Sequence, residues 1–344
     1  MKFSKISITL LIITFLGCTK EPSSPAPQAQ KQYRASNIER NFIDDRTIVF
    51  ENLEKEITYM ADLKLLEDGR FSFVDTYYTS QAYVFNSDGT LHCELGKRGE
   101  GPGEYESPTG LTTSKGSFYL TSTNARLNVY DKDCVFEKMN HLPSNVTIAK
   151  GLHTSGDGNL LLPVFSRYSK KSIYLFSESG ESQKEFSQID KDFPNGFDTF
   201  NPQGSIIVQK NQLLQFFNHR YEVIFFDDEY KESKRIRLHS SLYVPPDYAK
   251  AKTLNGGRSE LAYRATFTQF IGLKPYKDGY VTVLRSWPSE KKSTDVIEFW
   301  DNSFMGTGRY QIPEEEQFVG SWGDELIFFK VDDMTSKLIF RKEL

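Results

Sequence analysis

Arginine and aromatic residues recur at one point of a repeated pattern in this chain, and their chemistry is suited to ligand binding. Guanidinium groups pair with carboxylates and phosphates, whereas aromatic faces stack on sugar rings or cations. We therefore predict a ring of loop side chains that receives an anionic ligand, such as an acidic glycan or a peptide carboxylate. The alternative is that these side chains are ordinary solvated loop residues. The candidate members are Arg126, Arg167, Tyr168, His219, Arg220, Arg285 and Trp287.

The sequence contains no comparable set of catalytic or metal-binding residues. The inner strands predicted below provide Asp62 and His153 but no group of carboxylates that would converge on a cation. The five histidines lack metal-site spacing, and no Gly-x-Ser-x-Gly nucleophile motif is present. We predict a binding or scaffolding protein with no metal and no cofactor. The alternative is a metal-dependent, lactonase-like hydrolase or a carbohydrate-processing enzyme whose ligands come from loops.

A repeated strand signature must position these loops. It is clearest where Tyr83–Phe85 runs into a turn at Asn86–Gly89, since aromatic and β-branched residues favour strands and Asp-Gly favours a hairpin. Regular recurrence of such a unit is typical of a repeat fold. The pattern predicts an all-β, six-bladed β-propeller with four-stranded antiparallel blades. The other copies are Asn128–Asp131, Tyr174–Ser177, Ile224–Asp227, Ile297–Asp301 and Leu338–Arg341.

The last copy has room for only three strands before the chain ends at Leu344. We expect the strand at Thr47–Phe50 to supply the fourth and to close the ring, because closure removes two exposed sheet edges. A five-bladed body with an irregular tail is the alternative. The propeller is predicted to span residues 45–344, with an insertion at about 242–268. Within that insertion, Asp247 is suited to cap a short helix.

The N-terminal residues are typical of a bacterial lipoprotein. Residues 1–17 combine two lysines with an apolar run too short to cross a bilayer, and they end at Cys18 in a lipobox-like context. Acylation of Cys18 would anchor the protein in the lipid bilayer. Because Thr19 and not Asp follows Cys18, we expect the outer membrane, on either its periplasmic or its surface side. Residues 18–44 are predicted to be a flexible tether. The alternative is an ordinary secretory signal.

Charge and cysteine content restrict the partners further. The formal net charge of −4 gives no sign of nucleic-acid binding, so we expect a glycan, a peptide or an envelope protein as the partner. Cys93 and Cys134 fall near the last strands of neighbouring repeats, which diverge in a propeller. We therefore predict two separate thiols and no disulfide bond.

The stretch from Gly96 to Tyr105 is the most distinctive in the chain. It resembles the Gly-x-Gly-Pro-Gly-Glu-Tyr loop of the six-bladed β-propeller lipoproteins, a group related to TolB-like and NHL-like propellers. The resemblance implies a propeller for the whole body, and it implies no particular activity. We interpret the loop as a structural strap, with a ligand-contacting loop as the alternative. Arg98, Glu104 and Tyr105 are the candidate contacts in the second case.

Substitution of Cys18 tests the predicted anchor. We expect Cys18→Ser to abolish acylation and to release the protein from the membrane fraction, because the acyl chains supply the membrane affinity. Fractionation with immunoblotting measures this, and circular dichroism checks that the β structure is unchanged. Full retention of the variant in membranes would rule out the lipobox.

Overall fold

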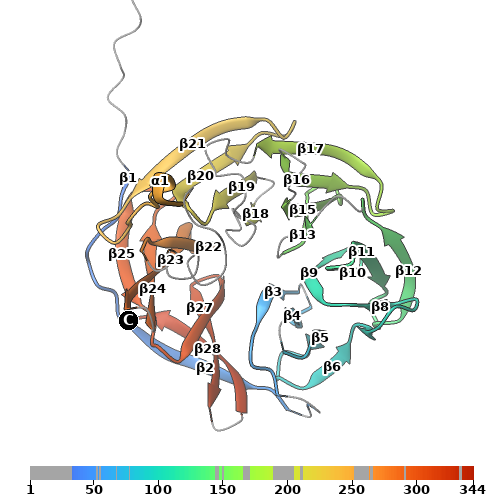
Figure 1. The fold of residues 1–344 in the computed structure, drawn as a ribbon. Coiled ribbons are helices and arrows are strands. Elements are labelled where there is room, and N and C mark those ends of the chain that lie inside the picture. Colours follow the sequence, from blue (N-terminus) through green and yellow to red (C-terminus); the bar gives the residue numbers. More distant parts are fainter. Residues whose placement is uncertain are drawn as a thin grey trace, which may run out of the picture. The chain divides into compact units, whose positions relative to one another are not determined.

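Each copy of the signature forms the third strand of a four-stranded antiparallel sheet, and six such sheets stand around one axis (Figure 1). This confirms the predicted all-β six-bladed propeller. Residues Gln32–Leu344 form one unit. The computed structural model describes residues 33–51, 53, 56–66, 68–76, 78–143, 147–148, 151–165, 171–188, 205–209, 212–251, 263, 266–289, 292–332 and 335–344.

The first three blades follow one another along the chain. Blade 1 consists of β3 (Ala61–Leu65), β4 (Phe71–Asp75), β5 (Gln81–Phe85) and β6 (Leu91–Glu94). Blade 2 consists of β9 (Pro108–Ser114), β10 (Ser117–Ser122), β11 (Arg126–Tyr130) and β12 (Phe136–His141). Blade 3 consists of β14 (His153–Thr154), β15 (Leu160–Phe165), β16 (Lys171–Phe176) and β17 (Ser182–Gln188), and β13 (Thr147–Ile148) also pairs with β15.

The other three blades complete the ring. Blade 4 consists of β18 (Ile206–Gln209), β19 (Gln212–Phe217), β20 (Arg220–Phe226) and β21 (Glu232–His239). Blade 5 consists of β22 (Gln269–Tyr276), β23 (Gly279–Ser289), β24 (Lys292–Trp300) and β25 (Gly306–Gln311). Blade 6 consists of β26 (Glu316–Trp322), β27 (Glu325–Asp332), β28 (Thr335–Glu343) and, from the N-terminal part of the chain, β2 (Phe42–Val49).

The core is divided among the blade junctions. A cluster of buried apolar side chains fills each of the six contacts between neighbouring blades. At the junction of blades 6 and 1, for example, Phe71 and Phe73 of one blade pack in the same cluster as Leu338 of the other. Both faces of each sheet are therefore covered by a neighbour, which explains why the middle strands are apolar throughout rather than alternating.

Closure follows the predicted route. β2 pairs antiparallel with β28, from Phe42 opposite Glu343 to Val49 opposite Lys337. Ile48 is buried in the junction with blade 1, so the N-terminal strand contributes to the core as well as to the edge. The N-terminal strand β2 and the C-terminal strand β28 thus share one sheet.

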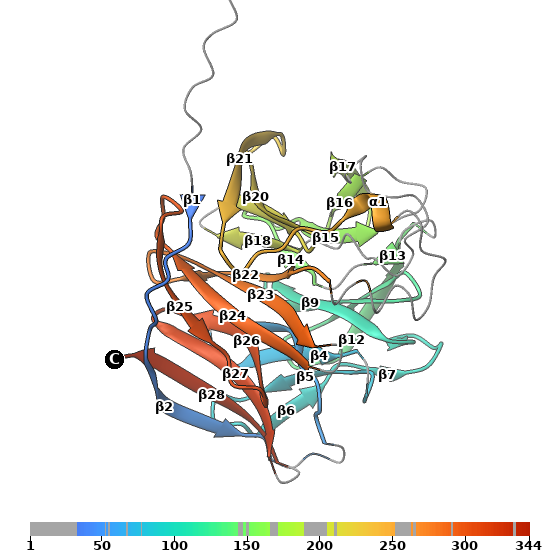
Figure 2. The same ribbon diagram turned by 60° about the vertical axis from the view of Figure 1, so that its left-hand side comes forward.

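The N-terminal segment continues this contact around the outside of the ring. We call residues 33–51 the belt. β1 (Tyr33–Arg34) pairs with β21 of blade 4, Glu39 bridges to Arg309 of blade 5, and Glu51 bridges to Thr90 of blade 1. Figure 1 shows the belt in blue outside blades 5 and 6. In Figure 2 the molecule is turned so that the belt comes forward. Strand pairing therefore begins at Tyr33, earlier than the boundary at residue 45 that the sequence suggested.

A turn position explains how neighbouring blades hold one another at the rim. In the first five blades, the turn before the fourth strand places one residue with positive φ against the preceding blade, and we call this the clasp position. Tyr230 lies with its ring centroid 5.0 Å from that of Phe186, and Phe304 lies 5.7 Å from Phe225. The five residues are Gly89, Cys134, Gly180, Tyr230 and Phe304, with φ of 92°, 67°, 82°, 59° and 58°.

The clasp position overturns the cysteine prediction. Cys134 forms a disulfide bond with Cys93 of β6, and their Cα atoms are 6.5 Å apart. The expectation of two separate thiols was wrong because Cys134 does not lie on a diverging outer strand. It lies in the turn that reaches back toward blade 1, where its N–H donates to Asp131 O at 3.0 Å. The disulfide bond is the covalent member of the clasp series.

The insertion after blade 4 contains the predicted short helix, α1 (Tyr248–Ala251). The Asp247 carboxylate accepts hydrogen bonds from the N–H groups of Ala249 at 3.0 Å and Lys250 at 3.1 Å, which is N-cap geometry. Among the described residues, no helix is long and apolar enough to span a bilayer.

The closing strand offers a matched pair of substitutions. Ile48 is 7% exposed and Val49 is 39% exposed on the same strand. We expect Ile48→Ala to lower the free energy of unfolding by about 2–5 kcal/mol, because it removes a buried side chain from the junction of blades 6 and 1. Val49→Ala should change it by less than about 0.5 kcal/mol. Urea unfolding measures both, and equal effects would contradict this account of closure.

Candidate functional site

A pocket of about 230 Å³ lies at the centre of the ring, between the inner strands. Its walls come from β3, β22 and β26, the first strands of blades 1, 5 and 6, and from segments of blades 3 and 4. Asn218, in the loop between the second and third strands of blade 4, also contributes to the lining. Its lining includes Tyr59, Asp62, Phe216, Lys274, Gln317 and Phe318.

Asp62 joins three blades at the axis. One carboxylate oxygen accepts hydrogen bonds from the backbone N–H groups of Leu111 in blade 2, at 2.8 Å, and Leu152 beside blade 3, at 3.2 Å. The other oxygen is 2.7 Å from Lys64 Nζ. Asp62 also has a φ of 52°, which a non-glycine residue adopts only when its surroundings hold it there. Its carboxylate is therefore committed to the protein itself.

Lys274 lies on β22 and faces the same pocket. Burial and, to a smaller extent, the positive charge of Lys64 lower its pKa from 10.5 to about 8, against an opposing contribution from the Asp62 carboxylate. Two lysines thus share one carboxylate, and the centre of the ring has a surplus of positive charge. An anionic group placed in the pocket would meet that surplus in a partly dehydrated setting, where charge pairing is stronger than in water.

His153 is the fourth polar member of this group. Burial, with the charges of Lys64 and Lys274, keeps its pKa well below 6.5, so the imidazole is neutral at pH 7. Its Nε2 atom is buried and has no hydrogen-bond partner among the described residues. A neutral imidazole beside two ammonium groups adds polarity without adding to the repulsion.

Three arginines of the predicted ring have acceptors within the protein. Arg126 donates to the Glu104 backbone oxygen at 3.2 Å, and Arg220 Nη1 is 3.5 Å from Glu222 Oε1. Arg285 makes a bidentate pair with Asp295 at 2.8 and 2.7 Å. Each guanidinium therefore already has an acceptor in the protein.

The remaining predicted residues are spread over different settings. His219 is buried at the end of β19, and Trp287 is half-buried on β23. Arg98 is exposed on the loop between blades 1 and 2. Arg167, Tyr168 and Cys18 lie outside the described residues.

The distinctive loop between blades 1 and 2 is held internally. Its ends form a short parallel pair, β7 (Lys97–Arg98) and β8 (Glu104–Tyr105). The Glu104 carboxylate accepts the Gly101 N–H at 2.7 Å and lies 3.4 Å from Lys97 Nζ. Tyr105 is completely buried, where a ligand cannot reach it, and its hydroxyl accepts the Ala82 N–H at 3.2 Å. This geometry agrees with the interpretation as a structural strap.

The two axial lysines were missed in the sequence. Lys64 and Lys274 stand among apolar residues in inner strands, in Asp-Leu-Lys-Leu and Gly-Leu-Lys-Pro. The signal that could have found them is a lysine that stands between apolar residues in a predicted inner strand, since lysine is rarely placed in a core.

The donor atoms at the axis do not suit a divalent cation. Among the described residues, Asp62 supplies the one carboxylate there, and it is already bonded. The two ammonium groups would repel a metal ion. Among the described residues, the one group of three histidine, cysteine or acidic side chains able to converge on a metal ion is His92, Cys93 and Cys134 at the rim.

Comparisons with known proteins agree on the fold. A family model described as "DUF5128: 6-bladed beta-propeller" matches residues 50–272. No curated protein matches the sequence. A protein named "Putative exported protein" from Bacteroides fragilis superposes with a TM-score of 0.67 at 14% identity, covering 90% of this chain and 99% of its own.

Two further solved structures have the same architecture. A DUF4221 family member from Bacteroides vulgatus gives a TM-score of 0.66 at 10% identity, with 90% of this chain and 99% of that chain covered. Virginiamycin B lyase from Staphylococcus aureus gives a TM-score of 0.52 at 11% identity, with 88% of this chain and 100% of that chain covered. At these identities the likeness concerns the fold alone.

Substitution of Lys274 tests the electrostatics of the pocket. A lowered folded-state pKa means that stability is fully present above the unfolded pKa of 10.5 and is lost as the pH falls through about 8. Lys274→Met should therefore raise the free energy of unfolding by about 3 kcal/mol at pH 7 and only about 1 kcal/mol at pH 10. Denaturant unfolding at both pH values measures this. Lys115→Met, at an exposed position in the turn between β9 and β10, is the control. A gain that does not shrink with pH would contradict the lowered pKa.

Proposed function

Because this chain belongs to the DUF5128 family of six-bladed β-propellers, we propose that it is a binding protein that receives an anionic group in its axial pocket. The observation that carries this is the charge at the axis, where Lys64 and Lys274 share the single carboxylate of Asp62. An incoming carboxylate or phosphate would restore the balance beside Lys274. The side chains that contact the anion in this proposal are thus axial lysines in place of the loop arginines.

The pocket lining narrows the class of ligand. Tyr59, Phe216 and Phe318 lie in the same pocket as Lys274. Aromatic faces beside a cation suit a ring with a charged substituent, since the ring can stack while the anion pairs with the ammonium group. The pocket volume of about 230 Å³ accommodates one such unit of a larger molecule. An acidic sugar at the end of a glycan fits this description best, and a peptide carboxylate shares its charge.

We place this activity outside the cytoplasm, on a protein held to the bilayer by acylated Cys18, as in the six-bladed propeller lipoproteins. The lipobox-like sequence before Cys18 supports this address, and so does the name of the Bacteroides fragilis structural neighbour. A metal-dependent hydrolase has less support, because the axial donors are lysines rather than a set of carboxylates. A rigid ring with a cationic centre favours binding over catalysis.

Calorimetric titration of the full chain with Cys18→Ser tests the proposal. Glucuronate should bind, and neutral glucose should bind at least about tenfold more weakly, because it lacks the charge that Lys274 pairs with. Affinity should fall as salt is added. Lys274→Met should lower the affinity for glucuronate at least about tenfold, which corresponds to the loss of one charged pair.

The control is Lys115→Met, which removes an equal charge from an exposed turn and should leave the affinity unchanged. Since Lys274→Met is expected to stabilise the fold, lost binding cannot be explained by unfolding. If neither glucuronate nor inorganic phosphate binds the unsubstituted protein, or if Lys274→Met binds them equally well, the axial pocket is not an anion site.

A further inference from the structure

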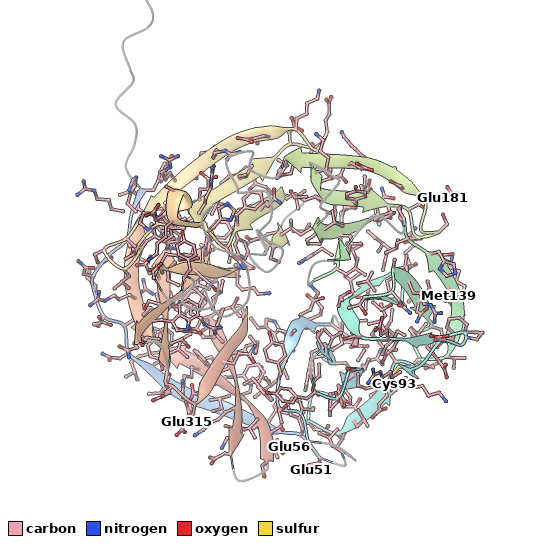
Figure 3. All side chains as sticks on the ribbon, in the orientation of Figure 1. Glu51, Glu56, Cys93, Met139, Glu181 and Glu315 are labelled. Carbon is pink, nitrogen blue, oxygen red and sulfur yellow. A yellow bond between two sulfur atoms is a disulfide. The ribbon has the colours of Figure 1, made fainter. Side chains whose placement is uncertain are left out.

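The rim of the ring holds a second group of side chains with chemistry of its own. His92 and Cys93 lie on β6 of blade 1, and Cys134 lies at the clasp position of blade 2. One ligand atom from each of the three lies within 4.8 Å of the other two. Figure 3 labels Cys93 on the outer side of this blade junction, away from the axis. The group is thus separate from the axial pocket.

The clasp positions explain why Cys134 lies against blade 1, but they do not explain the presence of His92 beside the disulfide bond. At the other clasp positions, glycine or an aromatic residue makes the contact between blades without an added imidazole. His92 is exposed beside the sulfur atoms. The Asp133 carboxylate, next to Cys134 in the sequence, is paired with Lys132 Nζ at 2.8 Å and is not part of this group.

The turn that carries Cys134 is fixed by its own hydrogen bonds. Asp131 Oδ1 accepts the N–H groups of Asp133 at 2.9 Å and Val135 at 2.8 Å, and the Cys134 N–H donates to Asp131 O. None of these bonds requires the sulfur–sulfur link. The backbone would therefore hold Cys134 opposite Cys93 after that link is broken.

We propose that reduction of the Cys93–Cys134 disulfide bond opens a binding site for a thiophilic cation such as Zn²⁺, with His92, Cys93 and Cys134 as its ligands. Two thiolates and an imidazole are the donor set that zinc prefers, and a water can complete the tetrahedron. Oxygen-seeking cations such as Ca²⁺ and Mg²⁺ are disfavoured by the sulfur atoms.

The reaction balances with a dithiol as the reductant. A dithiol gives two electrons and two protons to the disulfide bond. The products are the two cysteine thiols and the cyclic disulfide of the reductant. Binding of the cation then releases the two thiol protons, because thiolates are the ligands. The cation replaces the covalent link between blades 1 and 2, so the clasp persists in either redox state.

Cobalt is a suitable probe because thiolate-bound Co²⁺ absorbs in the near ultraviolet and visible regions, whereas Zn²⁺ is silent. The full chain with Cys18→Ser, which removes the third cysteine, is reduced with dithiothreitol, freed of it by anaerobic gel filtration, and titrated with Co²⁺. We expect one equivalent to bind with thiolate charge-transfer bands that Zn²⁺ removes. The oxidised protein should give none. The melting temperature should fall on reduction and recover when Zn²⁺ is added.

Three variants define the ligands. His92→Ala should lower the affinity for Co²⁺ at least about tenfold, since even substitutions of residues that only support the metal ligands lower affinity that much. Cys134→Ser should abolish the charge-transfer bands. His141→Ala, at an exposed histidine on the outer strand of blade 2 and outside the cluster, should have no effect.

Four outcomes would overturn the proposal. They are equal Co²⁺ affinity in the oxidised protein, equal affinity in His92→Ala and in the reduced parent, a folded reduced protein without thiolate bands, and a reduced protein that unfolds even when Zn²⁺ is present. Circular dichroism on the same samples separates the last two.

Discussion

The antiparallel pairing of β2 with β28 is the contact on which the rest of the ring depends. The hydrophobic core is divided among six blade junctions, and the junction of blades 6 and 1 exists only when the two ends of the chain meet. Without β2, blade 6 would present the unpaired edge of β28, and Ile48 would be lost from the junction. The inner strands keep their places around the axis because the ring is closed. Closure therefore also fixes the distance from Asp62 to the blades that its carboxylate joins.

The centre of the ring combines a structural tie with a destabilising charge. Asp62 satisfies backbone groups of blades 2 and 3, which stabilises the convergence of the inner strands. Lys274 has the opposite effect at neutral pH, because its ammonium group is held in a site that lowers its pKa. Proteins keep such groups mainly where they serve binding or catalysis, which is why we assign the anion site to the lysine and the structural role to the aspartate.

The sequence predicted the elements that depend on residues close together in the chain. Tyr83–Phe85 and its copies have strand composition and sit beside hairpin turns, so their place as third strands could be foreseen, as could the capping of α1 by Asp247. Residues 33–44 could not be foreseen as part of the body, because they are polar and lack periodicity. They are held by distant partners, such as Glu343, whose carboxylate accepts hydrogen bonds from Arg40 at 2.9 Å. The Cys93–Cys134 bond and the axial lysines likewise depend on which segments meet across blades.

The belt also determines how the protein would respond to a mechanical load. Tension applied through the residues before Tyr33 first reaches the two-residue pairing of β1 with β21, then the Glu39 bridge and the Arg40 contacts, and only then the longer ladder of β2. These attachments follow one another along the chain, and the longest ladder comes last. A sudden pull would be absorbed by detaching blades 4 and 5 from the belt, while the ring stays closed and its axial pocket keeps its shape.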